Sequence, residues 1–394
     1  MDFGFTVAQE SIRKEVHDFF INELPEDYQG VFFMITPARE EFGSFSQELQ
    51  RKVGEKGWLT PGWPKEYGGL GLSEMDQAII KEEVGYWVWA WPNYVGNEIA
   101  GPPILLFANE EQKNKFLPPI IQGKVQWDQL FTEPNAGSDE ANVQLRATAD
   151  GDDFILNGQK MFVGEIYEPD YFYTLARTLD VTPKHRGLSL FIIPADTPGI
   201  THSLLPVMSG QMKKEIFFDN VRVSKKSQLG ELNRGFSHTM ASLEFERAFL
   251  GRPSTDIREL EEFVQFCKET ERNGKPLIED PQVRDALARM VVELEVCRLA
   301  SWRTVWKISQ REKLGPLNYD LSGFYRRTFS TSRYKAMMDI LGLYGQLGYG
   351  SKWAPMAGTV ERNWQRVRSQ HAGGTTEIFK VVLAERGLSL PRRR

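Results

Sequence analysis

Two short stretches of the sequence combine glycines, hydroxyls and turn-forming residues in a way that could bind a polar or anionic group. In the first, Phe131-Thr-Glu-Pro-Asn-Ala-Gly-Ser-Asp139, small residues and hydroxyls beside a turn offer backbone N–H groups to an anion or to the polar edge of a ring. The second, Gly373-Gly-Thr-Thr-Glu377, precedes a helix-like run from Ile378, and such a helix start can cradle phosphate. Taken alone, each stretch is more often a plain surface turn or a connection between helices.

The composition argues against several other kinds of chemistry. The two cysteines, Cys267 and Cys297, show no CxxC spacing, and the five histidines form no pair at helical spacing, so neither a disulfide framework nor a protein-held metal is predicted. A net charge of −5 gives no general attraction to nucleic acid or to an anionic membrane. No stretch approaches the roughly 20 apolar residues of a membrane span, and the N-terminus does not resemble a signal peptide. We therefore expect a cytoplasmic enzyme or binding protein.

The spacing of apolar residues changes twice along the chain and divides it into three expected domains. Residues 1–122 have helical spacing, residues 123–232 alternate with a period of two, and residues 233–394 return to long helical segments with few breakers. The short strands of the middle part predict a β-barrel or sandwich, and the long helices of the last part predict a four-helix bundle. The expected fold class is therefore α+β with several domains.

Local signals place the first elements within these domains. Polar residues that can cap free N–H groups predict helix starts at Thr6 and Ser44, each within a capping-box pattern, and at Ser73 and Asn109. Alternating or continuous apolar runs, bounded by Pro, Gly and Asp, predict strands in the middle domain. These strands are expected at Val143–Ala149, Phe154–Leu156, Tyr171–Ala176, Leu188–Ile193 and Ile216–Val223.

Six motifs follow one another in the order that they have in the acyl-CoA dehydrogenase family, and the chain resembles that family over essentially its whole length. Any one motif alone would be a weak signal, but six in order are specific. The motifs span Tyr67–Gly71, Phe131–Asp139, Leu156–Lys160, Gly187–Pro194, Phe218–Val223 and Leu229–Phe236. The resemblance implies the fold of that family, with non-covalent FAD between the middle domain and the helical bundle.

The resemblance also implies which residues contact FAD. Thr132 corresponds to the threonine whose backbone and hydroxyl touch the flavin, and Ser138 to a serine near the diphosphate and the CoA arm. The family usually has tryptophan and then a hydroxyl residue at the positions of Phe162 and Gly164; phenylalanine can still stack, whereas glycine has lost the hydroxyl. The remaining expected contacts to the cofactor come from Gln129, Phe131, Thr375 and Glu377.

The reaction that the resemblance implies is an α,β-desaturation, and it needs a base. A carboxylate removes the weakly acidic α-proton of the thioester, and burial raises the pKa of such a base towards neutrality. Most of the family carries this glutamate at the position of Gly373, which has no carboxylate, although its N–H can still donate to the thioester oxygen. A minority carries the base on a helix, in the pattern L-x-x-E-R, which matches Leu243-Glu-Phe-Glu-Arg247. We therefore expect Glu246 to be the base and Arg247 to contact the CoA arm; Glu244 is the weaker candidate.

The chain departs from the family pattern where a subunit normally reaches a neighbour's FAD. An arginine and a phenylalanine are replaced by Thr270 and Asn273, and a glutamine by Gly342. This combination resembles the members that handle bulky acyl groups, including steroid side chains and dicarboxylic acids, some of which are heterotetramers of two chain types. The aromatic cluster around Tyr86–Tyr94 would suit a ring-bearing acyl group, but plain packing is its more common role.

By resemblance, then, the partners are an acyl-CoA substrate, an electron-transfer flavoprotein as electron acceptor, and either further copies of this chain or a second acyl-CoA dehydrogenase chain. Three alternatives stay open at this point. The chain could be a non-catalytic or half-site subunit of a heteromer, an acyl-CoA oxidase that passes electrons to oxygen, or a family member that acts on a nitro or amine substrate.

Overall fold

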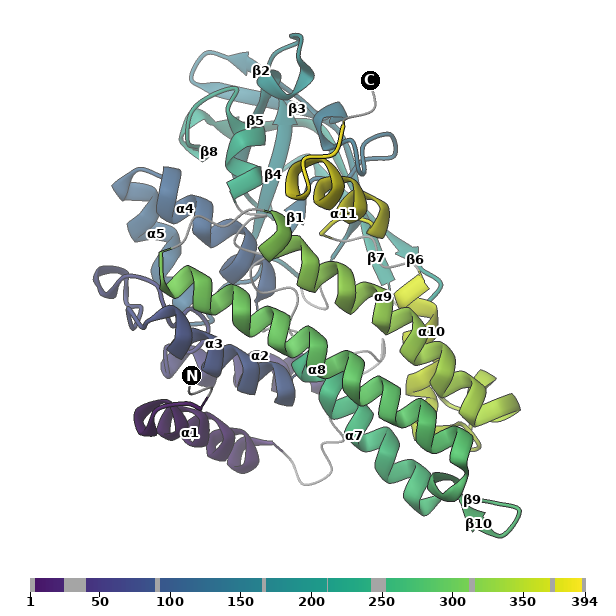
Figure 1. The fold of residues 1–394 in the computed structure, drawn as a ribbon. Helices are drawn as coiled ribbons and strands as arrows, with labels where there is room; N and C mark the ends of the chain where they lie inside the picture. The colour runs from purple at the N-terminus through teal and green to yellow at the C-terminus, as the bar shows by residue number, and fades with distance from the viewer. Residues whose placement is uncertain are drawn as a thin grey trace.

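Helices occupy both ends of the chain and a sheet occupies its middle (Figure 1). The structure is a computed structural model that describes residues 4–24, 40–88, 93–164, 168–210, 212–241, 253–311, 316–368 and 373–391. Within these ranges no helix is both long and apolar enough to cross a bilayer. The expected order of a helical part, a sheet and a second helical part is confirmed.

The first helical part contains α1 (Val7–Glu23), α2 (Glu40–Glu55), α3 (Glu74–Trp87), α4 (Gly101–Phe107) and α5 (Glu110–Ile121). Three of the predicted starts are confirmed. Thr6 and Asn109 each form a complete capping box, and Ser73 accepts a hydrogen bond from a backbone N–H of the first turn of α3.

The predicted start at Ser44 is wrong, because Ser44 lies inside α2, which begins at Glu40 in the described residues. Ser44 and Gln47 match the capping-box letters, but such a box forms only where the chain enters the helix from a non-helical residue. Glutamate is a good helix former, so Glu40 and Glu41 do not end the helix before Ser44.

The middle of the chain forms one sheet of eight strands in the described residues, in the order β6-β7-β3-β2-β4-β5-β8, with β1 paired to β4 in parallel. The strand predicted from Val143 begins later, at Arg146. The Val143 carbonyl accepts a hydrogen bond from the side chain of Arg177, and the Leu145 carbonyl accepts one from the Arg177 backbone N–H at the end of β4. The strand bounds are β1 Trp127–Leu130, β2 Arg146–Asp150, β3 Asp153–Val163, β4 Tyr171–Arg177, β5 Leu188–Pro194, β6 Ile200–Pro206, β7 Met212–Ser224 and β8 Gln228–Leu229.

The sheet and the first helical part share one hydrophobic core. Phe116 and Leu117 of α5 pack with Trp127 of β1 and with inward-facing residues of the other strands, such as Leu156 and Phe191. Gln112 adds a polar link, since its amide donates to the carbonyls of Lys226 and Gln228 beside β8 at 3.0 and 2.8 Å. Helix α5 is therefore attached to the sheet both by apolar packing and by two hydrogen bonds.

The second helical part packs around a separate core made by α7 (Ser254–Glu269), α8 (Pro281–Ser309), α9 (Pro316–Leu341) and α10 (Thr359–Arg368). Figure 1 shows α8 and α9 running side by side, with α11 (Thr376–Val382) near the C-terminus. A short hairpin, β9 (Glu271–Arg272) and β10 (Lys275–Pro276), follows α7. The predicted helical bundle is confirmed.

Candidate functional site

The motif Phe131–Asp139 begins where β1 ends and forms a true turn. Glu133 and Ala136 exchange two backbone hydrogen bonds of 3.0 and 3.1 Å, which leaves Pro134 and Asn135 as the exposed tip. Proline and asparagine are typical of such a tip because proline presets φ and asparagine bonds its own backbone. Phe131 is buried, whereas Thr132 is only half-buried and Ser138 is exposed. The turn therefore presents Thr132 from a rigid strand end.

A buried ion pair lies directly behind this turn. The ammonium of Lys160, which is fully buried on β3, lies 2.8 Å from the Glu133 carboxylate and donates to the carbonyl of Phe131 at 3.0 Å. The same carboxylate accepts the backbone N–H groups of Gln144 and Leu145 at 2.6 and 2.9 Å. Burial lowers the pKa of Lys160 to about 8, although Glu133 acts in the opposite direction.

Neither member of this pair was assigned a role from the sequence, although both lie in motifs that carry the family resemblance. A signal was present for Lys160. It stands at an even spacing from Phe154 and Leu156, whose side chains face the core, so the alternation of β3 puts a lysine on the buried face. A buried lysine needs a carboxylate partner, and the sequence alone does not say which one.

Phe162 and Gly164 follow at a bulge in β3. The register of β3 against β7 shifts between Lys160 and Val163, and the backbone of Phe162 is left-handed, with φ +57°. A bulge of this kind turns a side chain away from its expected face, and the Phe162 side chain is 54% exposed. The backbone N–H of Met161 donates to the carbonyl of Thr132 at 2.9 Å, so Phe162 lies next in the chain to a residue bonded to Thr132. An exposed aromatic ring beside a half-buried threonine fits the stacking and edge contacts of a flavin.

Arg177 holds the loop that follows Ser138. Arg177 is 4% exposed, and its guanidinium donates to the carbonyls of Ala141 and Val143 at 2.7 and 2.8 Å, and to that of Lys184 at 3.2 Å. These bonds fix the stretch between Ser138 and β2 from the side of β4. This role also escaped the sequence interpretation, because a carbonyl acceptor leaves no mark in the sequence.

The loop at Gly373 leads into a helix, as its glycines and threonines indicate. Gly373 and Gly374 both have left-handed backbones, with φ +73° and +111°, a region that favours glycine. Thr375 caps α11, because its hydroxyl oxygen accepts the N–H of Ile378 at 3.2 Å. Glu377 is exposed in the first turn of α11, and its negative charge weakens the attraction of that helix end for an anion.

Other predicted residues lie elsewhere. Gln129 is half-buried on β1, two residues before Phe131. Glu246 and Arg247 lie outside the described residues. Asn273 and Gly274, both with positive φ, form the tip of the β9–β10 hairpin, which Figure 1 shows at the opposite end of the molecule from the sheet.

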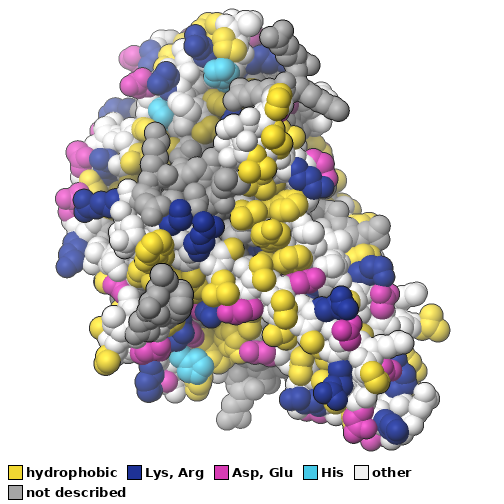
Figure 2. Space-filling model, in the orientation of Figure 1, with side chains coloured by type: hydrophobic (Ala, Val, Ile, Leu, Met, Phe, Trp, Pro, Cys, Tyr) yellow, Lys and Arg dark blue, Asp and Glu magenta, His cyan; other side chains and the backbone are white. Residues whose placement is uncertain are grey.

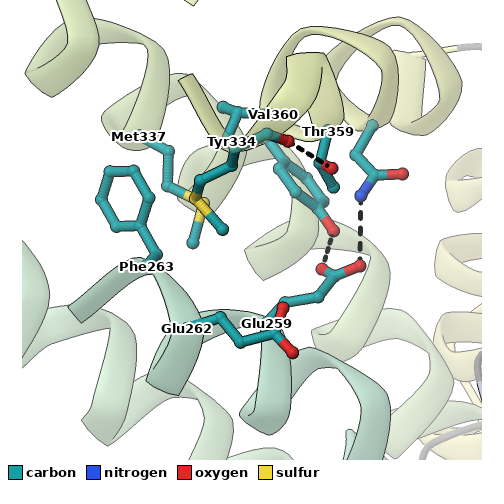
Figure 3. A pocket seen from close by; sticks show the side chains of 9 residues that line it. Glu259, Glu262, Phe263, Tyr334, Met337, Thr359 and Val360 are labelled. Carbon is teal, nitrogen blue, oxygen red and sulfur yellow. Dashed lines mark hydrogen bonds between the residues drawn. The ribbon is translucent and has the colours of Figure 1, made fainter. Parts of the chain in front are cut away.

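A cluster of buried charges joins α7, α9 and α10, and no sequence signal pointed to it. Asp256 accepts from Arg326 at 2.7 Å and from Arg333 at 2.5 Å. Figure 3 shows the neighbouring Glu259 bonded to the Tyr334 hydroxyl. The Glu259 carboxylate also accepts from the Asn363 amide at 3.1 Å, and these side chains line a cavity of about 10 Å³. Such a volume holds at most one water molecule, so this cavity has no room for a flavin or an acyl group, and the cluster joins helices.

The described residues contain no group of three or more His, Cys, Asp or Glu side chains that could hold a metal ion. The polar groups gathered near the end of β1 are instead backbone amides, hydroxyls and one buried ion pair. This is the chemistry of a site for an organic cofactor that has polar edges.

Comparison with known proteins identifies the family. Models of the acyl-CoA dehydrogenase N-terminal, middle and C-terminal domains match residues 6–124, 129–221 and 233–388. The acyl-CoA dehydrogenase FadE26 of Mycobacterium tuberculosis is 32% identical over 100% of this chain and 99% of its own length. The solved Tcur3481-Tcur3483 steroid ACAD and the ChsE4-ChsE5 complex from Mycobacterium tuberculosis are each 31% identical over 100% of both chains, with TM-scores of 0.88 and 0.87. The chain therefore belongs to the acyl-CoA dehydrogenase family, whose members are oxidoreductases that act on CH–CH bonds with FAD as cofactor.

Proposed function

We propose that this chain introduces an α,β double bond into a bulky, branched or ring-bearing acyl-CoA thioester, with Glu246 as the base. The observation that carries this proposal is the vacancy at Gly373 combined with the L-x-x-E-R match at Leu243–Arg247. The left-handed backbone at Gly373 and Gly374 suits glycine, so this loop offers N–H groups and no carboxylate. A dehydrogenase of this kind still needs a base, and Glu246 is the matching candidate.

A short helix that precedes Glu246 in the sequence is attached to two other parts of the fold. This helix covers residues 235–241, and Gly235 lies so close to the backbone of Ser189 on β5 that a Cβ there would meet it at 2.7 Å. Glu246 comes five positions after Ala241 in the sequence and lies outside the described residues. His238 stacks on Phe107 of α4, with the ring centroids 4.1 Å apart. The helix at residues 235–241 is therefore attached both to the sheet and to the first helical part.

In the proposed mechanism, the Glu246 carboxylate removes the α-proton of the thioester. Negative charge then develops on the thioester oxygen, where the N–H of Gly373 is a preorganised donor. Arg247 and Ser138 bind the CoA arm and hold the acyl chain in line. FAD, when bound against Thr132 and Phe162, supplies the acceptor for the hydride that leaves the β-carbon. An electron-transfer flavoprotein then receives the electrons.

The substrate class rests on the relatives. The Tcur3481-Tcur3483 structure is described as a steroid ACAD and covers this chain completely. A ring-bearing acyl group is therefore the first substrate to test, with a short straight-chain acyl-CoA for comparison.

The test of the base is anaerobic bleaching of the flavin by a steroid side-chain acyl-CoA. Glu246→Gln keeps the size of the side chain but cannot accept the proton, so the bleaching rate should fall by about 100-fold or more. The FAD spectrum before substrate addition should stay as in the wild type. Glu244→Gln is the matched control, because it makes the same change two residues away and should bleach at close to the wild-type rate.

Two outcomes would contradict the assignment. If Glu246→Gln bleaches at the wild-type rate, Glu246 is not the base. If Glu244→Gln is the slow variant, the base is Glu244 and not Glu246.

A second candidate is a half-site subunit that shares its flavin site with another acyl-CoA dehydrogenase chain. The replacements at Gly164, Thr270 and Gly342 favour it, and the ChsE4-ChsE5 structure is a complex of two named proteins. The outer face of α8 also favours assembly with further chains, since it exposes the apolar side chains Val292, Val296, Leu299 and Trp306. Figure 2 shows hydrophobic side chains gathered in a band on the face where α8 and α9 lie.

A helix that is apolar on its outer as well as its inner face is usually covered by another chain. Purification from the native host separates the two candidates. A single yellow chain with activity supports the complete enzyme, whereas a chain that binds FAD only together with a second co-purifying acyl-CoA dehydrogenase supports the half-site.

A further inference from the structure

The buried pair Lys160–Glu133 is attached to the backbone on three sides. Besides the 2.8 Å contact within the pair, Lys160 donates to the Phe131 carbonyl, and Glu133 accepts the N–H groups of Gln144 and Leu145. The pair thus joins the end of β1, the turn that follows it, the loop before β2, and β3. Apart from the contact within the pair, these bonds all go to main-chain groups, so what the pair holds in place is main chain.

The segments that the pair joins are the ones that carry Thr132 and Phe162. Phe131 precedes Thr132 directly, and Lys160 lies two residues before Phe162. A further hydrogen bond of 2.9 Å, from the Met161 N–H to the Thr132 carbonyl, joins the same two segments directly. We call the segments joined by these bonds, residues 131–133, 144–145 and 160–161, the frame. A shift of either strand would therefore move Thr132 and Phe162 relative to each other.

From these contacts we infer that Lys160 and Glu133 are positioning residues, which fix the Thr132 and Phe162 segments at the separation that the flavin ring requires. This inference rests on the proposed function, in that it takes Thr132 and Phe162 to be the flavin contacts. Neither charged group needs to touch the cofactor, because each acts through the backbone.

The use of charges here has a physical reason. Well-packed apolar residues would often stabilise a core as much as a buried ion pair does, or more. Apolar side chains, however, cannot bond a carbonyl and two N–H groups in fixed directions. Residues that support a site from behind must hold it to within about 0.5 Å, and directional, charge-assisted bonds to the main chain do this.

The chain offers a matched control in a second buried pair, Lys81–Glu98. Its two side chains are 9% and 10% exposed, and their ammonium and carboxylate lie 2.5 Å apart. Lys81 is on α3 and Glu98 on the short π-helical segment Val95–Ala100, both within the first helical part. Removing this pair should cost stability without removing any of the bonds that Lys160 and Glu133 make to the main chain.

The experiment compares Lys160→Met, Glu133→Gln and the control Lys81→Met with the wild type, each in the assembly in which the chain purifies. FAD affinity is measured by flavin fluorescence, and the exchange of backbone amides with deuterium is followed in the apo chain. We expect Lys160→Met and Glu133→Gln to bind FAD about tenfold more weakly or worse. The amides of Gln144, Leu145 and Met161 should exchange faster in both, whereas Lys81→Met should change neither quantity.

Several results would overturn the inference. One is wild-type FAD affinity and wild-type exchange in folded Lys160→Met and Glu133→Gln. Another is an equal loss of FAD affinity in Lys81→Met, because the effect would then be a general loss of stability. If Lys160→Met does not fold, the isosteric Glu133→Gln decides. If the wild type takes up no FAD in any assembly, the proposed function fails, and the exchange of the three amides still decides whether the pair holds the frame.

Discussion

The middle sheet and the helical bundle both bury charged side chains, but they connect these charges to different partners. In the sheet, Lys160 and Glu133 bond to each other and otherwise to backbone carbonyl and N–H groups. In the bundle, Asp256 bonds to the guanidinium groups of Arg326 and Arg333, so one helix is joined to another through side chains. The first arrangement fixes the path of the main chain beside a binding site, and the second fixes the packing of helices.

This difference predicts different consequences for the two regions. Loss of a charge in the sheet should disturb flavin binding locally, whereas loss of a charge in the bundle should lower the stability of the fold. Variants in each region can test whether the sheet and the bundle respond independently to the loss of a buried polar group.

The largest effect is expected for Asp256→Asn in the bundle. Arg333 is 1% exposed, and the substitution leaves its guanidinium without a charged partner at Asp256. Removing one member of a buried ion pair costs about 3–5 kcal/mol, so the midpoint of urea unfolding, followed by circular dichroism, should fall markedly. In the same variant, the exchange of the Leu145 and Met161 amides should stay as in the wild type at temperatures where the chain is folded.

The control for this prediction is Lys335→Met on α9. Lys335 pairs with Asp339 at 2.6 Å, but both side chains are about two-thirds exposed. Exposed pairs contribute only about 0.2–1 kcal/mol, so this variant should unfold close to the wild type. Faster exchange at Leu145 in Asp256→Asn would show that the two regions are not independent and would break the comparison.

The two regions also differ in what their sequences reveal. The cap at Asn109 and the turn at Pro134-Asn135 depend on residues within a few positions of one another, and the sequence is sufficient to predict both. The Asp256–Arg333 and Glu133–Lys160 pairs join residues 77 and 27 positions apart. Their formation depends on helix packing and strand register, which no local pattern specifies.

The same difference between local patterns and properties of the whole chain explains which predictions about the family, the fold and the cofactor were confirmed. The order of six motifs was enough to predict the family, the fold and the cofactor, because those properties belong to the whole chain. The wrong helix start at Ser44 shows how a four-residue pattern fails when its neighbours also favour a helix. Glu246 lies outside the described residues, so its role as the base stays a prediction.

An intermediate effect is expected from the pH dependence of Lys160. Burial lowers the pKa of Lys160 in the folded chain to about 8, whereas in the unfolded chain it is about 10.5. Between these values the unfolded state binds more protons than the folded state, so the free energy of unfolding gains a contribution that rises with pH. The stability of the wild type relative to Lys160→Met should therefore increase from pH 8 to 10.

Urea unfolding of both proteins at pH 7, 8, 9 and 10 measures this contribution, and the difference between them removes the titration of all other groups that the two share. A difference that stays constant with pH would mean that Lys160 has the same pKa in the folded and unfolded chains. A difference that falls with pH would mean that Glu133 raises the pKa of Lys160 more than burial lowers it.

The smallest effect is expected at Gln112, which is the neutral counterpart of Lys160. Gln112 is 7% exposed, and its side-chain amide also donates to two backbone carbonyls, those of Lys226 and Gln228, and so links α5 to the sheet. Gln112→Ala leaves both carbonyls without this donor and also removes the Gln112 half of the capping box at Asn109. Together these losses cost about 1–3 kcal/mol by urea unfolding. Because no proton is gained or lost at an amide, this cost should be the same at pH 7 and pH 10. If the free energy of unfolding lost in Gln112→Ala changes with pH, the increase in stability from pH 8 to 10 that is assigned to Lys160 comes from elsewhere in the sheet. If that loss is the same at pH 7 and pH 10, the increase is assigned to the buried ammonium group of Lys160.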